Sequence, residues 1–418
     1  MRRLLLLADD YTGALDAGVR LSEQGVSVRV VSEREGESAI RDCAEEALSI
    51  DMGSRRLAPE SAKTLVSKLV RIGIEHGFDH FYKKTDSALR GNIGAELAGM
   101  IDAAGSDAAG VTFVPAFPES GRTVSGGILY IDGVPVSDSV FGKDPFTPVM
   151  KSSVAEIIRG QTDFRTETVR RSQYGSLKEP FEAGCVRIVD AETTGDIDAI
   201  GEALKGTENT RFLSGCAGFA KQLPALIGFD RTEQPGLCPA DGLLVISGSL
   251  NPTTLKQVEW GKENGFTVFT LTREQKTRAD YLDTIECAAF VDMVCAALTE
   301  SGRVIIRSAG AAPEDEETLL DGKARTEKNI AAIASRVLNR SAECGLAVFG
   351  GDTLSSILLE LGVAGVIPVR EIEPGTVAAT IEIGSAKRLL ITKSGGLGSP
   401  DILGKILSFL YSAYLPAR

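Results

Sequence analysis

Short apolar runs alternate with segments of helical periodicity through the first half of the chain. Runs at residues 3–8, 26–31, 47–50, 80–84 and 110–116 end at polar or glycine-containing turns, a pattern that predicts β-strands. Between them, residues 16–25, 59–76 and 93–104 repeat apolar positions at helical spacing. Strands that alternate with helices predict a parallel sheet that is covered by helices.

The second half repeats this alternation, and a different kind of segment separates the two halves. Strands are predicted at residues 242–247, 266–271, 303–308, 346–350 and 388–392. The stretch 233–242 contains two prolines and two glycines, which is typical of a linker. A chain of 418 residues is also too long for one typical core. We therefore predict an α/β protein with two domains, 1–235 and 240–418, each a largely parallel sheet with helices on both faces.

The region after the last strand predicted in the first half is less regular. Residues 128–136 alternate in polarity around Asp132-Gly133, the dipeptide that favours a two-residue hairpin turn. Residues 136–180 are more polar and irregular, and we expect them to form an excursion near the functional site.

Composition excludes several classes of function. Hydrophobic content is 43%, charged content is 24% and net charge is −12, which argues against broad binding to nucleic acid or to an anionic membrane. No apolar run approaches the roughly 20 residues of a membrane span. Asp9 and Asp10 interrupt the N-terminal apolar run too early for a signal peptide. The seven cysteines are scattered, without a C-x-x-C pair, which favours free thiols and a cytoplasmic protein.

Histidine chemistry has little place in this chain. Its two histidines, His76 and His80, fall in a predicted loop, where a surface or capping role is more common than metal binding. Catalysis is therefore expected to depend on carboxylates, lysines, arginines and backbone amides.

Charged side chains follow the predicted strands of the first half. Ligands of open parallel sheets bind beyond the carboxyl ends of the strands. The groups expected at that edge are Asp9, Asp10, Asp51, Arg55, Lys83, Lys84, Asp86, Ser87, Arg90 and Arg122. Arginine and lysine can hold a carboxylate, and carboxylates can accept hydrogen bonds from hydroxyl groups. The amides that open the helix at residue 93 could help to bind an anion. The alternative is a self-neutralising, solvated turn.

Small residues follow the strands of the second half instead. The turns are SGSLNP (247–252), SAGAA (308–312), GGDTLS (350–355) and KSGGLG (393–398). Glycines allow close approach of the backbone, and helix N-termini present free N–H groups to phosphate. Neither G-x-x-x-x-G-K-[ST] nor a G-x-G-x-x-G after the first strand of either half is present, so a P-loop is excluded and a dinucleotide dehydrogenase is disfavoured. Together the halves predict an enzyme that closes on an acidic, hydroxylated substrate and a nucleotide, with its active site in the inter-domain cleft.

An ordered set of motifs over nearly the whole chain resembles the four-carbon acid sugar kinases. These motifs are ADDYTGALDAG, SRRL, KKTDSALRGNIGAEL, VPAFPESGRTVSGGILYIDGVPV, SGSLNPTT, GGDTLSSILLELG and ITKSGGLGSPDIL. The resemblance implies an N-terminal sugar-acid-binding domain, a C-terminal nucleotide-binding domain, and ATP-dependent phosphorylation of the terminal hydroxyl of D-threonate, D-erythronate or 3-oxo-tetronate. Tyr11, Ala88 and the SGCAGF stretch (Ser214–Phe219) depart from the usual motifs, so the exact substrate stays open. The KK-x-DS-x-LRGN form is more similar to the threonate and erythronate kinases.

The resemblance also assigns residues to roles. For the substrate it implies Asp9, Asp10, Arg55, Lys84, Thr85, Asp86 and Ser87, to which the strand-end analysis adds Arg90. For the nucleotide it implies Ser247 or Ser249, Gly350, Gly351, Asp352, Thr353 and Gly395, to which the strand-end analysis adds Lys393.

The paired aspartates suggest a catalytic hypothesis. One of them, with Asp10 as our choice and Asp9 as the alternate, accepts the proton of the attacking hydroxyl, while the other caps the following helix or helps to place Mg²⁺. Mg²⁺ is inferred from ATP chemistry, since no dedicated metal motif is present. A hydroxy-acid dehydrogenase and a non-catalytic sugar-acid sensor are the alternatives of other classes. The oligomeric state is left open, with a homodimer as the candidate assembly.

Overall fold

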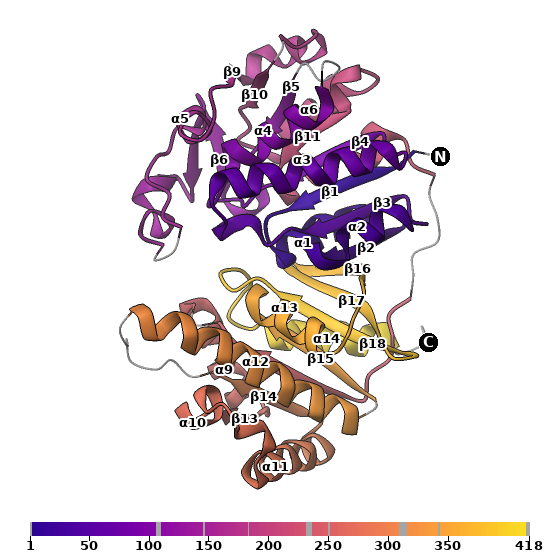
Figure 1. The fold of residues 1–418 in the computed structure, drawn as a ribbon, viewed down its shortest axis with the longest axis vertical. Helices are drawn as coiled ribbons and strands as arrows, with labels where there is room; N and C mark the ends of the chain where they lie inside the picture. Colours follow the sequence, from indigo (N-terminus) through magenta and orange to yellow (C-terminus); the bar gives the residue numbers. More distant parts are fainter. Residues whose placement is uncertain are drawn as a thin grey trace. The chain divides into compact units, whose positions relative to one another are not determined.

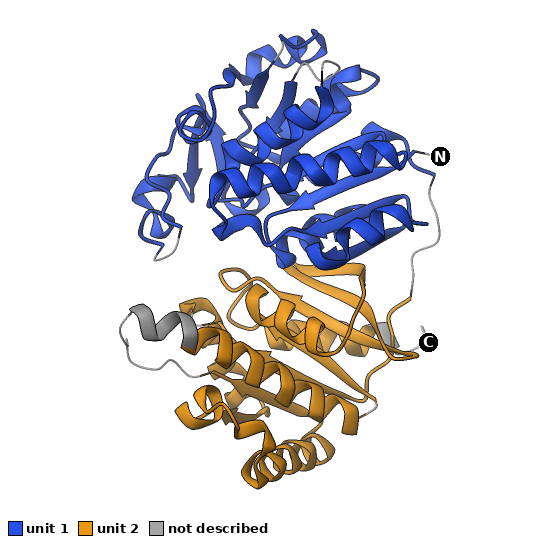
Figure 2. Cartoon of the chain, in the orientation of Figure 1, with its two compact units in different colours: residues 1–234 blue, residues 235–418 orange. Residues whose placement is uncertain are grey.

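The computed structural model of the chain forms two compact units. It describes residues 2–105, 110–144, 147–182, 184–230, 236–249, 251–308, 316–341 and 343–414. The two units are Met1–Gln234 and Pro235–Arg418 (Figure 2), here called unit 1 and unit 2. The linker predicted at 233–242 falls partly on residues 231–235, which lie outside the described residues.

The sheet of unit 1 has eight strands among the described residues, and all of them pair in parallel. Their spatial order is β2 (Val28–Ser32), β3 (Ala47–Asp51), β1 (Leu4–Ala8), β4 (His80–Lys84), β11 (Phe212–Gly215), β5 (Gly110–Val114), β10 (Cys185–Val189) and β9 (Arg165–Val169). Every residue of β1, β3, β4, β5 and β10 is buried, as expected for strands covered on both faces.

The connections of unit 1 run in two directions from the centre of its sheet (Figure 1). The chain passes from β1 to β2 through α1 (Tyr11–Ser22), and returns through α2 (Glu33–Arg41), α3 (Pro59–Glu75) and α4 (Ile93–Ala104). Right-handed crossovers in opposite directions place α1 on one face and α2, α3 and α4 on the other. Accordingly, α3 packs against α2 and α4, and α1 packs against α7 (Ala217–Ala220). The remaining helices are α5 (Val154–Arg159), α6 (Thr194–Leu204) and α8 (Leu223–Ile227).

A small antiparallel sheet precedes the irregular region of unit 1. It consists of β6 (Arg122–Ser125), β7 (Ile128–Ile131) and β8 (Val134–Pro135). Asp132 and Gly133 have φ angles of 49° and 81°, the left-handed values of a type I′ turn, so the predicted hairpin is confirmed. Between residues 136 and 180, the described residues form short 3₁₀ turns, α5 and β9.

Unit 2 has seven strands among its described residues, in the order β13 (Thr267–Thr270), β14 (Arg303–Arg307), β12 (Gly242–Ser247), β15 (Cys344–Phe349), β18 (Ala386–Lys393), β17 (Thr376–Ile383) and β16 (Val366–Glu373). The first five are parallel to one another, and β17 pairs antiparallel with both β18 and β16. The sequence analysis did not predict β16 and β17. The predicted α/β class, with largely parallel sheets and helices, is confirmed.

Six helices of unit 2 accompany its sheet in the described part of the chain (Figure 1). They are α9 (Pro252–Glu263), α10 (Arg273–Thr277), α11 (Ile285–Ser301), α12 (Glu316–Arg340), α13 (Gly351–Glu360) and α14 (Ile402–Tyr414). One core joins β12, β15 and β18 to α9 and α14, through Leu243, Phe349, Ile391, Val258 and Ile402. Every helix of the described segments is too short or too polar to cross a membrane.

The cysteines and histidines are placed as follows. All seven cysteines are free thiols. His76 ends α3 as its C-cap and is exposed, as expected. His80 corrects the expectation of a loop position: it is a buried residue of β4, with Nδ1 3.1 Å from Asp79 Oδ1.

Candidate active site

Three neighbouring strands of unit 1 deliver the predicted charged cluster. The register pairs Ala8 of β1 with Asp51 of β3 and with Lys84 of β4, so the residues that follow each strand emerge side by side. Arg55 follows β3 in a single 3₁₀ turn, Ser54–Arg56, whose preceding Gly53 has a left-handed φ of 57°. The direction of the crossovers changes at these strands, which is where open α/β sheets bind ligands.

The Arg55 guanidinium is the centre of this cluster. Its Nε lies 2.7 Å from Asp9 Oδ2, one terminal nitrogen lies 2.7 Å from Asp10 Oδ2, and the other lies 3.6 Å from Asp86 Oδ1. The paired aspartates can therefore lie side by side because one planar cation bridges them. Its side chain keeps 18% of its surface exposed, so a ligand can still reach it.

The two aspartates are not equivalent. Asp10 is the N-cap of α1, since its Oδ1 accepts the Gly13 N–H at 2.7 Å. Burial alone would raise the pKa of the Asp10 carboxyl, but Arg55 and Lys84 outweigh that effect and lower it. The Asp10 side chain is 27% exposed, whereas that of Asp9 is 1% exposed. Asp9 Oδ1 is buried and has no hydrogen-bond partner in the described part of the protein.

The turn after β4 is partly self-neutralised. Arg90 binds Asp86 through two contacts of 2.9 Å, and a third nitrogen lies 3.2 Å from Asp144 Oδ2. Arg90 and Arg55 hold the pKa of Asp86 well below its usual range, against the effect of burial. Arg90, predicted to bind substrate, is thus committed to carboxylates of the protein. Because Asp144 belongs to the irregular region, that region does reach this turn.

Other members of the turn retain unused hydrogen-bonding capacity. Thr85 Oγ1 is fully buried and has no partner among the described residues. Lys84 Nζ donates to the Thr85 carbonyl oxygen at 2.9 Å, which leaves two of its three donors for other oxygens. Ser87 is half-buried beside Asp86.

A buried network of hydrogen bonds and one ion pair holds the turn that carries Arg55. Lys83 Nζ lies 3.0 Å from Glu96 Oε2, and both side chains are almost completely buried. The Ser54 hydroxyl donates to the other oxygen of Glu96. Asn92 Nδ2 donates to the carbonyl oxygens of Ser54 and Leu57, at 2.9 and 2.8 Å. Lys83 is therefore a supporting residue, in contrast to its predicted place at the ligand edge.

Glu96 and Asn92 were missed by the sequence analysis, although one signal was present. Glu96 is a lone carboxylate in the first turn of a helix whose other residues are mostly small or apolar. Burial raises the pKa of Glu96, and Lys83 opposes that rise.

The start of α4 also differs from expectation. The N–H groups of Gly94 and Ala95 donate to Gln161 Oε1, at 2.8 and 3.3 Å. These amides were predicted to help bind an anion, but the Gln161 side chain already satisfies them.

Asp51, the last residue of β3, adjoins the cluster. It is buried, and its Oδ1 accepts the Gly53 N–H at 2.8 Å. Burial raises the pKa of Asp51 to about 7; Asp10 and Asp9 add to the rise, while the Gly53 bond and Arg55 oppose it.

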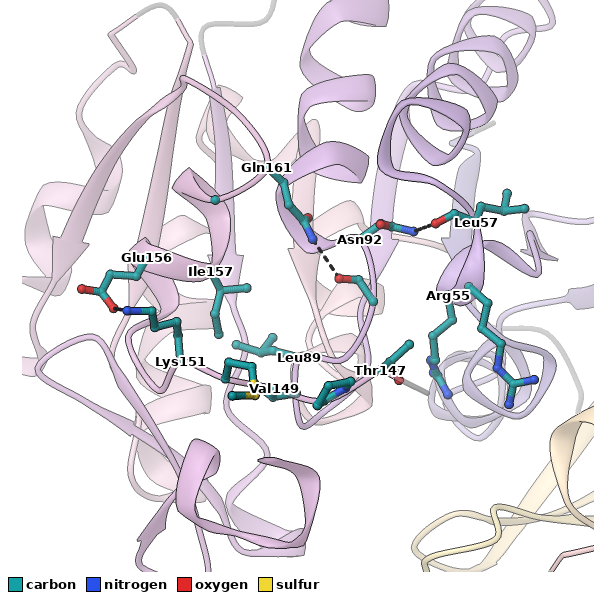
Figure 3. Close-up of a pocket in the computed structure, with 15 residues that line it drawn as sticks. Arg55, Leu57, Leu89, Asn92, Thr147, Val149, Lys151, Glu156, Ile157 and Gln161 are labelled. Carbon is teal, nitrogen blue, oxygen red and sulfur yellow. Dashed lines mark hydrogen bonds and ion pairs between the residues drawn. The ribbon is translucent and has the colours of Figure 1, made fainter. Parts of the chain in front are cut away.

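A pocket of about 520 Å³ adjoins the cluster (Figure 3). Figure 3 shows Arg55 at one end of it and the Lys151–Glu156 ion pair at the other. Its wall consists of Arg55, Arg56, Leu57, Leu89, Gly91, Asn92, Thr147, Pro148, Val149, Met150, Lys151, Glu156, Ile157, Gly160 and Gln161. Its size falls within the range of small-molecule sites, roughly 300–1,000 Å³.

In unit 2, the loops after β12, β15 and β18 pack closely on one another. The Gly248 N–H donates to the Phe349 carbonyl oxygen at 3.3 Å, and the Gly350 N–H donates to the Lys393 carbonyl oxygen at 3.0 Å. A Cβ atom on Gly248 would lie 1.9 Å from Thr353 Oγ1. One on Gly395 would lie 2.8 Å from Ser249 Oγ. These glycines are therefore required by close approach and not only by turn conformation.

The GGDT segment opens α13 as predicted. Gly350 is its N-cap, with φ 121°, and Gly351 is its first residue. The first N–H groups of a helix lack partners within the helix and can face an anion. Asp352 is exposed and forms an ion pair with Lys323 of α12, while Thr353 is buried.

Two other predicted nucleotide residues lie at the end of β12 and in the loop after it. Ser247 is buried at the end of β12, and Ser249 is half-buried. In the predicted SAGAA loop, residues 309–312 lie outside the described residues.

Lys393 differs from its predicted role. Its side chain is fully buried and its ammonium donates to the carbonyl oxygens of Ser394 and Leu397, at 2.8 and 3.0 Å. Two weaker contacts reach Thr254 Oγ1 at 3.3 Å and the Gly395 carbonyl oxygen at 3.4 Å. The ammonium thus holds its own loop, and its three donors are used there.

The described residues include no group of three or more His, Cys, Asp or Glu side chains arranged to hold a metal ion. Single carboxylates remain, and Mg²⁺ typically takes one or two of these and completes its shell with phosphate and water oxygens. The donor set is therefore compatible with Mg²⁺ that accompanies a nucleotide.

Sequence comparison divides the chain as the fold does. A family described as "Sugar-binding N-terminal domain" matches residues 4–223, and one described as "Nucleotide-binding C-terminal domain" matches residues 244–403. The charged cluster falls within the first match, and the loops after β12, β15 and β18 fall within the second.

Curated relatives are similar over their full length. A D-threonate kinase of Salmonella typhimurium is 27% identical over 432 residues, 99% of this chain and 99% of that protein. A D-erythronate kinase of Heliobacterium modesticaldum is 27% identical, over 98% of this chain and 97% of that protein. A 3-oxo-tetronate kinase of Pseudomonas savastanoi pv. phaseolicola is 26% identical, over 97% of each. A solved structure from Salmonella typhimurium LT2, described as a putative tRNA synthase, has the same fold, with TM-score 0.78 and 20% identity over 97% of this chain and 99% of that one.

Proposed function

The chain belongs to the four-carbon acid sugar kinase family, and we propose that it transfers the terminal phosphoryl group of ATP to the terminal hydroxyl of D-threonate or D-erythronate. It is thus a phosphotransferase with an alcohol group as acceptor. The observation that carries this proposal is the contrast between a bridged carboxylate–guanidinium cluster in unit 1 and glycine-rich, phosphate-compatible loops in unit 2. 3-oxo-tetronate is the alternative substrate, because named 3-oxo-tetronate kinases are similar to the same extent.

The unused groups of unit 1 match a polyhydroxy acid. Asp9 Oδ1 and Thr85 Oγ1 are buried without partners among the described residues, and each can accept a hydrogen bond from a sugar hydroxyl. The Arg55 nitrogen that lies 3.6 Å from Asp86 is too far for a hydrogen bond to it. That nitrogen and Lys84 are our candidates for the substrate carboxylate.

Asp10 is our choice for the proton acceptor. It is the more exposed of the pair, and its Oδ2 faces Arg55 while its Oδ1 remains on the Gly13 amide. As the substrate oxygen bonds to phosphorus and ADP leaves, the hydroxyl proton passes to Asp10 Oδ2. A lowered pKa is compatible with this role, because phosphoryl transfer depends more on positioning and charge neutralisation than on a strong base.

The loops of unit 2 are our candidates for the ATP phosphates. The N–H groups at the start of α13 and of the Gly395-Gly396 segment can donate to phosphate oxygens, and glycine leaves room for that approach. Mg²⁺ would be held by the phosphates with a carboxylate such as Asp352, where it neutralises phosphate charge. A hydroxy-acid dehydrogenase and a non-catalytic sensor have no specific observation in their favour.

The test is an ADP-release assay with ATP and Mg²⁺ against a panel of four- to six-carbon sugar acids. We expect release with D-threonate or D-erythronate and little with five- and six-carbon acids. Release only with 3-oxo-tetronate would select the alternative substrate. No release with any four-carbon acid, together with NADH oxidation in the presence of a keto acid, would overturn the kinase assignment.

A further inference from the structure

The buried ammonium of Lys393 occupies an unusual environment. Its partners are neutral oxygens, namely three backbone carbonyls and the Thr254 hydroxyl, and the ring of Phe349 lies beneath it with its centroid 5.0 Å away. Burial lowers the pKa of Lys393 to about 7, and Glu373 opposes this. Burying a charged group is unfavourable unless it is paired or hydrogen-bonded. Here the contacts that compensate the ammonium are with neutral oxygens and an aromatic ring.

The cage resembles a site for a monovalent cation. Rings of backbone carbonyl oxygens can replace the hydration shell of a monovalent cation. Here the oxygens of Ser394, Gly395 and Leu397 come from a single loop that curves around the ammonium. Their mutual repulsion would oppose this curvature if no cation lay between them.

Other groups hold the same loop in the same orientation. Thr254 Oγ1 donates to the Gly395 carbonyl oxygen at 2.8 Å. Gln257 Nε2 donates to the carbonyl oxygens of Leu397, Gly398 and Ser399, at 3.3, 3.1 and 2.9 Å. The backbone of Lys393 also accepts the Gly350 N–H, so one residue connects the loops after β15 and β18 with helix α9.

Peptide geometry turns this arrangement into a binding surface. In a trans peptide the N–H points away from the C=O of the same unit. Because the carbonyls of Ser394, Gly395 and Leu397 point at the ammonium, the N–H groups of the following residues, Gly395, Gly396 and Gly398, point away from it. Successive outward N–H groups of this kind form anion-binding concavities.

We propose that the Lys393 ammonium is a built-in monovalent cation, which shapes the 394–398 loop so that its N–H groups bind an ATP phosphate. Lys393 is then a positioning residue that never touches the nucleotide. The cage itself is a cation site, and it will accept a free alkylammonium ion when the side chain is removed. The phosphate part of this proposal rests on the proposed function.

The test combines side-chain deletion with chemical rescue. Lys393→Ala removes three methylenes and the ammonium, the atoms that n-propylammonium supplies. Lys393→Met keeps the stem in place and removes the charge. ATP and D-erythronate binding are measured by calorimetry with n-propylammonium or tetramethylammonium chloride at equal ionic strength. The measurements are made at pH 6, below the pKa of about 7, so that Lys393 of wild type carries its charge, and melting temperatures are recorded without nucleotide. Lys387→Ala, an exposed lysine on the same strand, is the matched control.

We expect Lys393→Ala to bind ATP at least 10-fold more weakly and n-propylammonium to restore most of that loss. Rescue should be absent in Lys393→Met and with tetramethylammonium, and D-erythronate binding should not change. In Lys393→Ala, n-propylammonium should also raise the melting temperature without ATP. That second readout tests the cage even if wild type proves unable to bind ATP, which would overturn the proposed function alone. Wild-type ATP affinity in Lys393→Met, or a loss in Lys393→Ala that no cation restores, would overturn the inference.

Discussion

The Arg55 guanidinium of unit 1 binds carboxylates, whereas the Lys393 ammonium of unit 2 binds neutral oxygens. Arg55 follows β3 and connects it with the turn after β1, whereas Lys393 ends β18 and connects the loops after β15 and β18. Arg55 keeps 18% of its side-chain surface exposed, while Lys393 is fully buried. The first cation can therefore exchange partners with a ligand, and the second can only shape the loops that meet one.

This difference suits the two proposed ligands. A small sugar acid is distinguished by its hydroxyls and carboxylate, which charged groups recognise in pairs. A nucleotide phosphate is held by backbone N–H groups, which require the correct loop shape and no side-chain charge. Substitutions at the two cations and around them should consequently affect different ligands.

The largest effect is expected from Asp10→Asn. The amide can still cap α1 through its oxygen, but it cannot accept the hydroxyl proton, so kcat should fall about 10²-fold or more with a smaller change in KM. Steady-state kinetics with the preferred acid measures this. Turnover near wild type would remove Asp10 from the chemistry, and a defect in Asp9→Asn instead would transfer the role to Asp9.

Arg55→Lys should weaken the acid site specifically. An ammonium cannot reproduce the planar fork that joins Asp9 and Asp10, and a loss on the order of 1–3 kcal/mol of charge-assisted hydrogen bonding is expected. KM for the acid should rise more than kcat falls, and KM for ATP should stay within twofold. Arg71→Lys, an exposed arginine of α3, is the control. An equal rise in both KM values would argue against separate sites.

Gly351→Val should weaken the nucleotide site and spare the acid site, with a rise of about 10-fold in KM for ATP. A branched side chain on the first residue of α13 would obstruct a phosphate at the helix start, so KM for ATP should rise while acid binding is retained. Gly195→Val, at the second residue of α6 in unit 1, is the matched control, because a Cβ there meets only Thr193 Oγ1 at 3.7 Å. Unchanged ATP kinetics would exclude the GGDT segment from the phosphate site.

Ser54→Ala tests whether the buried network positions Arg55. It deletes the hydrogen bond to Glu96 without disturbing the Lys83–Glu96 ion pair, and KM for the acid should rise about fivefold, equivalent to roughly 1 kcal/mol. A structural role alone would lower the melting temperature and leave KM unchanged, so both are measured. Ser54→Thr, which keeps the hydroxyl, should restore KM.

The last prediction concerns the stability of unit 1 and not its ligands. The pKa of Asp51 is raised to about 7 in the folded protein, so the Asp51 carboxyl loses its proton at lower pH in the unfolded chain than in the folded chain. Wild type therefore loses stability as pH rises from about 4 to 7, and Asp51→Asn does not. The variant should melt higher than wild type at pH 8 and equally at pH 4, because the difference between a folded pKa of about 7 and the ordinary value near 3.9 corresponds to about 4 kcal/mol at full size. A constant difference across that range would contradict the assigned pKa.

Much of the fold followed from local patterns. Buried strands such as β1 and β15 are continuous apolar runs, and Asp132-Gly133 favours its hairpin. The strands β16 and β17 were missed because Pro368 and charged residues interrupt the alternation, even though Pro374-Gly375 marks the turn between them.

The sequence predicted which residues gather in the site, but not which groups their side chains would contact. Parallel strand ends necessarily bring Asp9, Arg55 and Asp86 together. Sequence cannot tell which way a lysine at a strand end will point, so Lys83 and Lys393 were assigned to ligands although both are buried beneath their loops. The expected meeting of the two ligands in an inter-domain cleft, and the candidate homodimer, stay predictions.

The most direct test of separate acid and nucleotide sites is crossed calorimetry on the full chain. ATP with Mg²⁺, and separately the acid that the panel selects, are titrated into wild type, Arg55→Lys and Gly351→Val. The account predicts that Arg55→Lys loses affinity for the acid and keeps that for ATP, and that Gly351→Val does the reverse. If either folded variant loses both ligands to the same extent, or if the pattern is exchanged, the assignment of the acid to unit 1 and ATP to unit 2 is wrong.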